Sequence, residues 1–420
     1  MLQQIEGSAA VAQAVATCRP EVIAAYPITP QTHIVEGLGD MVKRGLVGNC
    51  EFLNVESEFG AMSVCIGSSA TGARTYTATS SQGMLFMMEA VYNASGMGLP
   101  IVMTVGNRAI GPPINIWNDW SDSMAARDAA WIQLFVEDNQ QAADVHVQAF
   151  RLAEAASLPV MVCMDGFILT HAYTRVDVPE QAQVDRFLPA FEPRQLLDPA
   201  APITMGAMVG PEAFAEVRFL AHYKQLEALD LIPRHAAEFA AIFDRDSGGL
   251  LKSFDAEDKD TVVVSMGSVI GTLKSVLADM RQDGSSIGLL SIRSYRPFPK
   301  QQLSDALANA KRVIVFEKCL AVGMGGILAA DVRMALANLS IPIYSVIGGL
   351  GGRPITQENL RRMLDKGVQD QLEEPHFHDL NVEVVHRELE RLRDIQRPGS
   401  SAESILRDIA GADAAARGSR

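Results

Sequence analysis

Three stretches of the sequence place a chemically useful residue at the end of an apolar strand candidate. They are "AAYPITPQT", which contains Thr29, "NVESEFG", which contains Glu58, and "VGNRAIGPP", which contains Arg108. A threonine hydroxyl can hydrogen-bond a polar ligand, a glutamate can hold a proton, and an arginine can bind an anion. Ligands of open α/β sheets bind at the carboxyl ends of the strands, so these residues are candidates for a binding site.

Thr29 lies between Pro27 and Pro30 in an unusually stiff stretch. Proline fixes its own φ near −65° and drives the residue before it, here Tyr26 or Thr29, towards extended geometry. A rigid backbone of this kind would keep the Thr29 hydroxyl in one place. The alternative, in which the prolines only end a strand, stays open on the sequence alone.

Arg108 and Glu58 each have an ordinary structural interpretation. The planar guanidinium of Arg108 suits a carboxylate, because it donates two parallel hydrogen bonds. A surface arginine paired with Asp119 or Asp122 would fit the same spacing equally well. Glu58 begins a predicted helix, where the helix dipole favours any carboxylate, and Glu56 could equally be a solvated partner.

Two glycine-rich turns resemble nucleotide-binding loops only in part. "AVGMGGIL" follows a strand and precedes a helix, but Leu328 stands where a GxGxxG turn needs its third glycine. We therefore favour a helix N-terminus packed closely on a strand, and an NAD-binding dehydrogenase subunit stays as an alternative. "GGLGGR" at 348–353 is predicted to be a loop where backbones or subunits approach. The sequence contains no GxxxxGK[ST] phosphate loop.

The composition fits a large α/β chain of two or three domains. The 420 residues are 48% hydrophobic and 20% charged, with a net charge of −14. So acidic a chain is not expected to bind nucleic acid, and an anionic substrate would need local arginines. The N-terminus has no basic stretch typical of a signal peptide, and no apolar run approaches bilayer length, so we expect no membrane span.

The five cysteines are far apart and form neither a CxxC motif nor a Cys/His pair. We therefore predict no metal ligands and no iron–sulfur cluster on this chain. Isolated thiols fit a reducing cytoplasm, with core packing as their default role.

The order of the elements predicts two α/β units. Short strand candidates alternate with helical stretches in the first half, which indicates a parallel sheet with helices on both faces. Charged, proline-containing residues at about 176–257 interrupt this pattern as an excursion and linker. Four further strand candidates begin with "TVVVSMG" and predict a smaller doubly wound unit.

Several stretches in order resemble one family. "AAYPITPQT", "NVESEFGA", "TATSSQGMLFMMEAVYNASGMGLPIVM", "GNRAIGPPINIWNDWSD", "MDGFILTH", "RSYRPFP" and "GGLGGRPIT" resemble the α subunit of 2-oxoacid:ferredoxin (or acceptor) oxidoreductases, the pyruvate-type multi-subunit enzymes above all. The resemblance covers roughly residues 5–365. It implies a thiamine-diphosphate-binding, pyrimidine-type doubly wound domain at 1–235 with a C-terminal excursion, a linker at 236–257, a transketolase C-terminal-like α/β domain at 258–395 and a flexible tail at 396–420.

The resemblance also implies an activity. Such enzymes decarboxylate a 2-oxo acid oxidatively with coenzyme A, giving acyl-CoA, CO2 and reduced ferredoxin or NAD. By motif, Thr29 would contact the oxo acid, Arg108 would grip its carboxylate, and Glu58 would hydrogen-bond the cofactor's aminopyrimidine ring. Pro27 and Ile28 would lie beside the cofactor.

Half of the family's cofactor site is missing from this sequence. The GDG…Asn pattern that binds diphosphate and Mg²⁺ is absent, since "MDGFILTH" has only Asp165-Gly166. The resemblance therefore implies a β subunit for diphosphate and Mg²⁺, and γ and ferredoxin-like δ subunits. It places [4Fe-4S] clusters, with FAD as an option, on those partners. We expect a cytoplasmic hetero-oligomer and a chain that is inactive alone.

The substrate is suggested by one substitution. Many relatives read NRALSAPINIW where this chain reads "NRAIGPPINIW", so Gly111 replaces a serine near Arg108. The lost side chain would open room in the substrate pocket for a bulkier acid such as phenylglyoxylate, although Pro112 could refill it. Pyruvate and phenylglyoxylate thus both stay open, as does a non-catalytic scaffold subunit.

Overall fold

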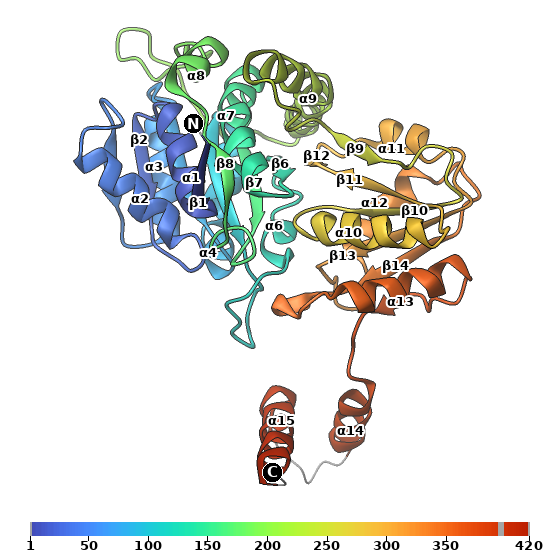
Figure 1. The fold of residues 1–420 in the computed structure, drawn as a ribbon. Helices are drawn as coiled ribbons and strands as arrows, with labels where there is room; N and C mark the ends of the chain where they lie inside the picture. The colour runs from blue at the N-terminus through green and yellow to red at the C-terminus, as the bar shows by residue number, and fades with distance from the viewer. Residues whose placement is uncertain (1, 394–398, 419–420) are drawn as a thin grey trace. The chain divides into compact units, whose positions relative to one another are not determined.

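The computed structural model describes residues 2–393 and 399–418. These residues divide into two compact units, Met1–His376 and Phe377–Arg420. Apart from Phe377, the last residue of the second sheet's edge strand, the larger unit contains both principal sheets (Figure 1). The smaller unit carries the helices α14 (Val382–Arg393) and α15 (Ser401–Gly418).

The first sheet has seven strands in the order β12-β6-β7-β5-β4-β2-β3. All pairs for which register is defined are parallel except β12 with β6. The strands are β2 (Val22–Ala25), β3 (Glu51–Asn54), β4 (Thr75–Thr79), β5 (Ile101–Asn107), β6 (Ile132–Phe135), β7 (Val160–Asp165) and β12 (Ser294–Arg296).

Helices cover both faces of this sheet, because successive residues of each buried strand point to opposite sides. Ile23 packs into the core on one face and its neighbour Ala24 into the core on the other. The first face carries α1 (Gly7–Thr17), α2 (Thr32–Lys43) and α7 (Asn139–Ala156). The second carries α3 (Glu58–Ala70), α4 (Gln82–Phe86), α5 (Met88–Gly96) and α6 (Ser121–Ala125). The predicted doubly wound arrangement is confirmed.

The second sheet has six strands in the order β15-β14-β13-β10-β11-β9. Its strands are β9 (Leu251–Phe254), β10 (Thr261–Ser265), β11 (Ile287–Ile292), β13 (Arg312–Glu317), β14 (Ile343–Ile347) and β15 (His376–Phe377). One face is covered by α10 (Val269–Gln282) and α13 (Gln357–Val368). On the other face lie α11 (Lys300–Ala306) and α12 (Ile327–Ala335), in a core continuous with the first sheet.

Two elements differ from the sequence-based expectation. Strand β9 lies inside the stretch predicted as a linker, where its four residues are too few to show a strand period. Strand β12, part of the "RSYRPFP" stretch, leaves the second sheet and pairs antiparallel with β6 of the first. Two short strands, β1 (Leu2–Glu6) and β8 (Tyr173–Asp177), also form a separate antiparallel pair.

The predicted domain boundaries stay predictions. Helix α9 (Phe214–Phe243) runs across the expected boundary at 235/236. The boundary at 395/396 falls outside the described residues.

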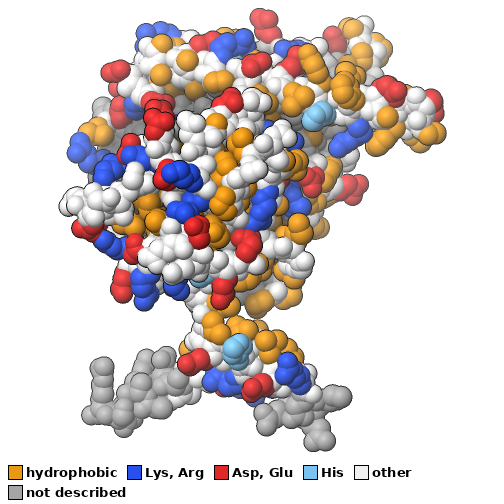
Figure 2. Space-filling model, turned by 90° about the vertical axis from the view of Figure 1, so that its right-hand side faces the viewer, with side chains coloured by type: hydrophobic (Ala, Val, Ile, Leu, Met, Phe, Trp, Pro, Cys, Tyr) orange, Lys and Arg blue, Asp and Glu red, His pale blue; other side chains and the backbone are white. Residues whose placement is uncertain are grey.

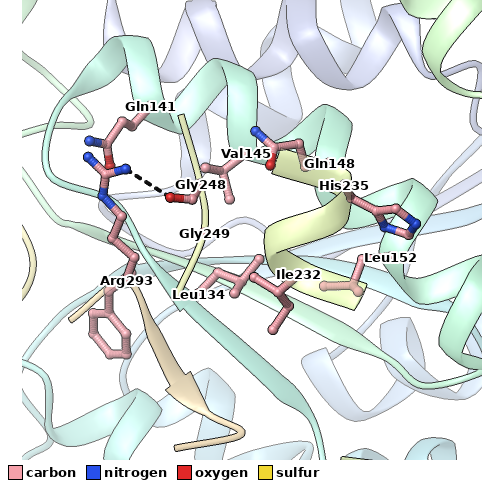
Figure 3. Close-up of a pocket in the computed structure, with 11 residues that line it drawn as sticks. Leu134, Gln141, Val145, Gln148, Leu152, Ile232, His235, Gly248, Gly249 and Arg293 are labelled. Atoms are coloured by element: carbon pink, nitrogen blue, oxygen red, sulfur yellow. Dashed lines mark hydrogen bonds between the residues drawn. The ribbon is translucent and has the colours of Figure 1, made fainter. Parts of the chain in front are cut away.

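The two sheets are joined by tightly packed side chains and ion pairs. Arg293, which follows β11, donates to Glu137 at 3.1 Å. It also donates to the carbonyl oxygen of Gly248 at 2.8 Å (Figure 3). The cavity beside it, lined by Leu134, Ile232 and other side chains, has a volume of only about 10 Å³. Since a single water needs about that much space, we interpret this region as a packed junction rather than a ligand site.

The visible surface of the larger unit mixes charges of both signs. Figure 2 shows Lys and Arg side chains interspersed with Asp and Glu, without a broad basic field. Within the described part of the chain, no helix combines the length and apolar character required to cross a bilayer.

Candidate active site

The candidate residues lie where β2 and β4 end. Strand β2 pairs with β3 on one side and with β4 on the other. The chain therefore goes from β2 to the sheet edge at β3 and then returns past β2 to β4. Loops leaving the two strands separate there and leave room for ligands. Thr29 follows β2, Glu58 follows β3 at the start of α3, and Arg108 follows β5.

Arg108 is held by two backbone carbonyl groups. Its Nε donates to the oxygen of Asn115 at 2.8 Å, and its Nη1 donates to the oxygen of Thr29 at 3.0 Å. The residue is only 8% exposed, and burial lowers the pKa of the guanidinium while Asp122 acts in the opposite direction. Of its five N–H donors, both on Nη2 and one on Nη1 bond to no described residue. The structure therefore brings Thr29 and Arg108 together and leaves the arginine able to bind an anion.

Asp122 organises the backbone around Arg108. Its fully buried carboxylate accepts from the backbone N–H of Ser81 and of Arg108, each at 2.9 Å. It also accepts from Asn107 Nδ2 and from the backbone N–H of Ser123, each at 2.8 Å. Burial raises the pKa of Asp122 to about 7, and the four N–H donors act against that rise.

This role of Asp122 is not predicted from the sequence. The spacing suggests Asp119 or Asp122 as a surface partner of the Arg108 side chain, whereas Asp122 is buried and binds the Arg108 backbone. The order "NDWSDS" shows an acid near the arginine, but no sequence spacing relates Asp122 to Ser81, which lies 41 residues away.

Glu58 is buried but keeps its carboxylate unpaired among the described residues. Ser57 caps α3 by accepting the Gly60 N–H at 3.1 Å, which places Glu58 in the first turn. Its Oε1 lies against the backbone of Gly83 in α4, where a Cβ would come within 2.7 Å of that oxygen. A glycine is therefore needed at this position, because the Glu58 carboxylate, on a residue that is 7% exposed, occupies the space that a Cβ would fill.

The remaining predicted site residues lie on the same edge. Pro27 is exposed and Ile28 is partly buried, with the Ile28 carbonyl accepting from the Gln31 N–H at 3.0 Å. A Cβ on Gly111 would come within 2.7 Å of Gln82 Nε2 and 3.1 Å of the Pro113 carbonyl oxygen. The α4 residue Gln82, next to Gly83, thus connects the surroundings of Glu58 with those of Arg108.

The edge also contains buried polar atoms with no partner in the described chain. They include Thr79 Oγ1, Ser80 Oγ and Gln31 Oε1. Burying a polar atom of this kind costs free energy unless the atom forms a hydrogen bond. Together with the unpaired Glu58 carboxylate, this donor and acceptor set fits an aminopyrimidine ring, which both donates and accepts hydrogen bonds.

The loop after β14 of the second sheet contacts the loop that follows Arg108. Asn115 Nδ2 donates to the Gly351 oxygen at 3.1 Å, and the Gly351 N–H donates to Asp119 Oδ2 at 3.1 Å. A Cβ on Gly352 would lie 2.3 Å from the Cβ of Trp117. The prediction that "GGLGGR" is a site of close backbone approach is confirmed.

The other glycine-rich turn is occupied by a protein carboxylate. Glu317 accepts from the backbone N–H groups of Leu328 at 2.8 Å and Ala329 at 3.0 Å, the donors at the start of α12. A Cβ at Gly326 would lie 2.1 Å from Glu317 Oε1. Because these N–H groups are the ones a dinucleotide pyrophosphate would use, close packing is the correct interpretation of this turn.

Comparison with known families agrees with the predicted resemblance. Residues 13–239 match the family described as "Pyruvate flavodoxin/ferredoxin oxidoreductase, thiamine diP-bdg". Residues 259–360 match "Pyruvate:ferredoxin oxidoreductase core domain II".

Curated relatives align over most of this chain. It is 47% identical over 367 residues to pyruvate synthase subunit PorA of Methanosarcina barkeri, covering 86% of this chain and 91% of that protein. It is 38% identical to ketoisovalerate oxidoreductase subunit VorA of Pyrococcus horikoshii, covering 87% and 95%.

Solved structures share the fold at low sequence identity. A chain of 2-oxoglutarate:ferredoxin oxidoreductase from Magnetococcus marinus has a TM-score of 0.67 at 21% identity, with 88% of this chain and 65% of that chain covered. A split gene transketolase has a TM-score of 0.52 at 13% identity, covering 87% and 99%. The predicted fold class, a thiamine-diphosphate-binding domain plus a transketolase C-terminal-like domain, is confirmed. This chain belongs to the pyruvate flavodoxin/ferredoxin oxidoreductase family, as an α subunit of the pyruvate/ketoisovalerate type.

Proposed function

We propose that Thr29, Arg108 and Glu58 form this chain's half of the active site of a thiamine-diphosphate-dependent 2-oxoacid:ferredoxin oxidoreductase. The reaction is the oxidative decarboxylation of a small 2-oxo acid with coenzyme A. The observation that carries this proposal is the buried Arg108 guanidinium, fixed beside Thr29 with three N–H donors left for an anion.

Arg108 binds and orients the substrate carboxylate. Its Nη1 and Nη2 present a planar pair of donors, and the bonds to Thr29 and Asn115 fix the plane before substrate arrives. The Thr29 hydroxyl, on an exposed residue between two prolines, contacts the same ligand. Fixing the carboxylate at two points aligns the adjacent carbonyl carbon for attack, which is a positioning effect.

Glu58 holds the cofactor ring. Its carboxyl group would form a hydrogen bond with a nitrogen of the aminopyrimidine and hold a proton there, and Pro27 and Ile28 would lie beside the ring. Thiamine diphosphate, when bound, supplies the carbon nucleophile and accepts the electron pair left by departing CO2. The burial of Glu58 shields this hydrogen bond from water.

Partner subunits complete the enzyme. A β subunit supplies the diphosphate and Mg²⁺ ligands, and γ and δ subunits carry the [4Fe-4S] clusters, with FAD only if NAD replaces ferredoxin as acceptor. Exposed apolar residues at the site edge support a protein partner there, including Phe86 at 60%, Ile114 at 81% and Trp117 at 53% exposure. The free and mostly buried cysteines support the prediction of a reducing cytoplasm.

We propose pyruvate or a similarly small aliphatic 2-oxo acid as substrate. The names of the PorA and VorA relatives support this choice. The space beside Gly111 is already taken by Gln82 and Pro113, so the missing side chain does not by itself make room for an aromatic ring. Phenylglyoxylate stays a prediction, tested by comparing kcat/KM for the two acids in the assembled complex and in its Gly111→Ser variant.

The test uses the purified complex with a Glu58→Gln subunit. We expect oxo-acid-dependent acceptor reduction to fall at least about 100-fold, the usual minimum contribution of a positioned proton-holding group. Glu56→Gln, which changes an exposed carboxylate two residues away, should retain activity. Intact turnover in Glu58→Ala would favour a scaffold subunit instead, and activity of the isolated chain would contradict the shared site.

A further inference from the structure

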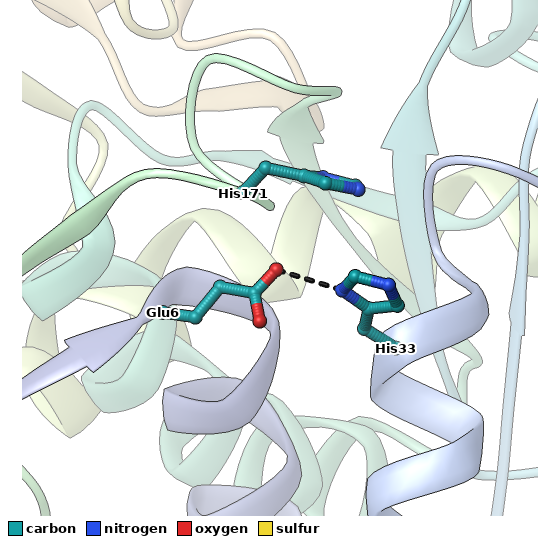
Figure 4. Close-up of side chains that lie close together, drawn as sticks. All are labelled: Glu6, His33 and His171. Carbon is teal, nitrogen blue, oxygen red and sulfur yellow. Dashed lines mark hydrogen bonds and ion pairs between the residues drawn. The ribbon is translucent and has the colours of Figure 1, made fainter.

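A second group of ligand-type side chains converges away from the candidate active site. Glu6 ends β1, His33 lies in the first turn of α2, and His171 lies in the loop between β7 and β8. Their nearest nitrogen and oxygen atoms all lie within 4.8 Å of one another. Figure 4 shows the three side chains reaching towards one another from separate elements.

Backbone hydrogen bonds hold the segments that contain Glu6 and His171 together. The Ser8 N–H and Oγ both donate to the Thr170 carbonyl oxygen, at 2.9 and 2.8 Å. The Gly7 N–H donates to the Ala172 oxygen at 3.1 Å, and Glu6 pairs with Tyr173 in the β1–β8 ladder. The backbone segments 6–8 and 170–173 are thereby held side by side, which places Glu6 close to His171.

The side chains already show part of a metal-site arrangement. Glu6 Oε1 lies 2.8 Å from His33 Nδ1, and the rings of His33 and His171 lie 4.8 Å apart. His171 Nδ1 is hydrogen-bonded to Thr170 Oγ1 at 2.7 Å, which leaves its Nε2 as the ligand atom. A hydrogen bond on the second ring nitrogen is the usual way that proteins orient a metal-binding histidine.

We propose that Glu6, His33 and His171 bind one Zn²⁺ ion through two imidazole nitrogens and one carboxylate oxygen. Tetrahedral coordination with bonds of about 2.0–2.2 Å needs ligand atoms roughly 3.4 Å apart. Ligand atoms that are now up to 4.8 Å apart therefore approach one another by up to about 1.4 Å, and His33 exchanges its bond to Glu6 for a bond to the ion. The 49% exposed His33 side chain gives the ion access, and water takes the fourth position.

This ion would act next to the active-site loop. His33 lies four residues after Thr29, and α2 begins between them at Thr32. Gly166, at the start of the His171 loop, is packed so closely on Pro30 that a Cβ would lie 2.5 Å from Pro30 Cγ. Binding of the ion connects the His171 loop to the first turn of α2, close in sequence to Thr29. Its expected effect is structural, because none of the three ligands belongs to the proposed catalytic group.

This group differs from the sequence-based prediction of no metal ligands, because its members are far apart in the sequence. Glu6 and His33 are 27 residues apart, and His171 joins them only through the β1–β8 pairing.

The experiment is a titration of the full-length, metal-free chain with Zn²⁺, and with Co²⁺ as a spectroscopic probe. We expect one equivalent to bind, visible Co²⁺ absorption of the low-coordinate type, and a higher Tm. His33→Ala and His171→Gln should each weaken binding at least tenfold and remove the Tm increase. Glu6→Gln, nearly isosteric, covers the case in which a histidine variant folds poorly.

The matched control is His222→Ala, which removes an exposed histidine on α9. It should leave affinity and Co²⁺ spectrum unchanged. Absence of Zn²⁺ binding at 100-fold molar excess over the chain overturns the proposal, and so does binding that persists at full affinity in a His33→Ala, His171→Gln double variant.

Discussion

The Arg108 guanidinium donates to the backbone carbonyl oxygen of Thr29 at 3.0 Å, across 79 residues of sequence. The proline-flanked loop after β2 and the arginine loop after β5 are therefore one unit. Movement of either loop changes the position of the anion-binding donors, so the two proposed substrate contacts cannot be disturbed independently.

Replacing Arg108 with lysine should weaken substrate binding strongly. Lysine keeps the positive charge but lacks the fork, so it cannot hold the Thr29 and Asn115 carbonyls and a carboxylate together. Losing two charge-assisted hydrogen bonds predicts a fall in kcat/KM of about 100-fold, mainly through KM. Steady-state kinetics of the complex measure this, with Arg127→Lys, a partly exposed site, as control. An unchanged KM would remove Arg108 from the substrate site.

Asp122→Asn should disturb the same site indirectly. All four groups bound to the Asp122 carboxylate are N–H donors, and the amide NH2 of asparagine would face two of them. Unsatisfied groups of this kind cost about 1–3 kcal/mol each. We expect a lower Tm together with a raised KM for the oxo acid, whereas a purely structural role would lower Tm and leave KM unchanged. Asp128→Asn, at an exposed site, is the control.

The ion pair between Lys318 and Asp165 should be costly to break. Both side chains are 1% exposed and 3.0 Å apart, and Trp120 Nε1 also donates to Asp165 at 2.8 Å. Lys318→Met leaves the carboxylate buried without its cation, which typically costs about 3–5 kcal/mol. Chemical unfolding should show this loss, and adding Asp165→Asn should recover part of it. Lys311→Met, in an exposed pair, should change stability by less than about 1 kcal/mol.

His146 predicts a loss of stability in acid. It is fully buried between Thr104 Oγ1 at 2.5 Å and the Ala142 carbonyl oxygen at 2.6 Å, and burial lowers its pKa to about 4. The unfolded chain binds this proton near pH 6.5 and the folded chain only near pH 4. The free energy of unfolding therefore falls as pH drops through that window, by up to about 3 kcal/mol.

The measurement is unfolding at several pH values for the wild type and His146→Gln. The glutamine variant should show a shallower pH dependence between about pH 4 and 6.5. Parallel curves for the two proteins would show that His146 does not titrate in this way.

Local patterns in the sequence predicted many of the strands in the two principal sheets and all three candidate residues. Apolar strand candidates, their alternation with helical stretches and the ordered family motifs predicted the doubly wound fold and placed Thr29, Glu58 and Arg108 at strand ends. These features were accessible because strand and helix periods, turn residues and motif spacings are written in neighbouring residues.

Which distant residues come into contact depends on the three-dimensional fold. Asp122 binding Ser81, Gly351 supporting Asn115, Glu317 filling the α12 N-terminus, and Glu6 joining His33 and His171 all depend on strand order and on the path of the loops. The short strands β9 and β12 likewise form only because they pair with β11 and β6. Such contacts follow from the packing of the whole chain, because no local period or spacing encodes which strand lies beside which.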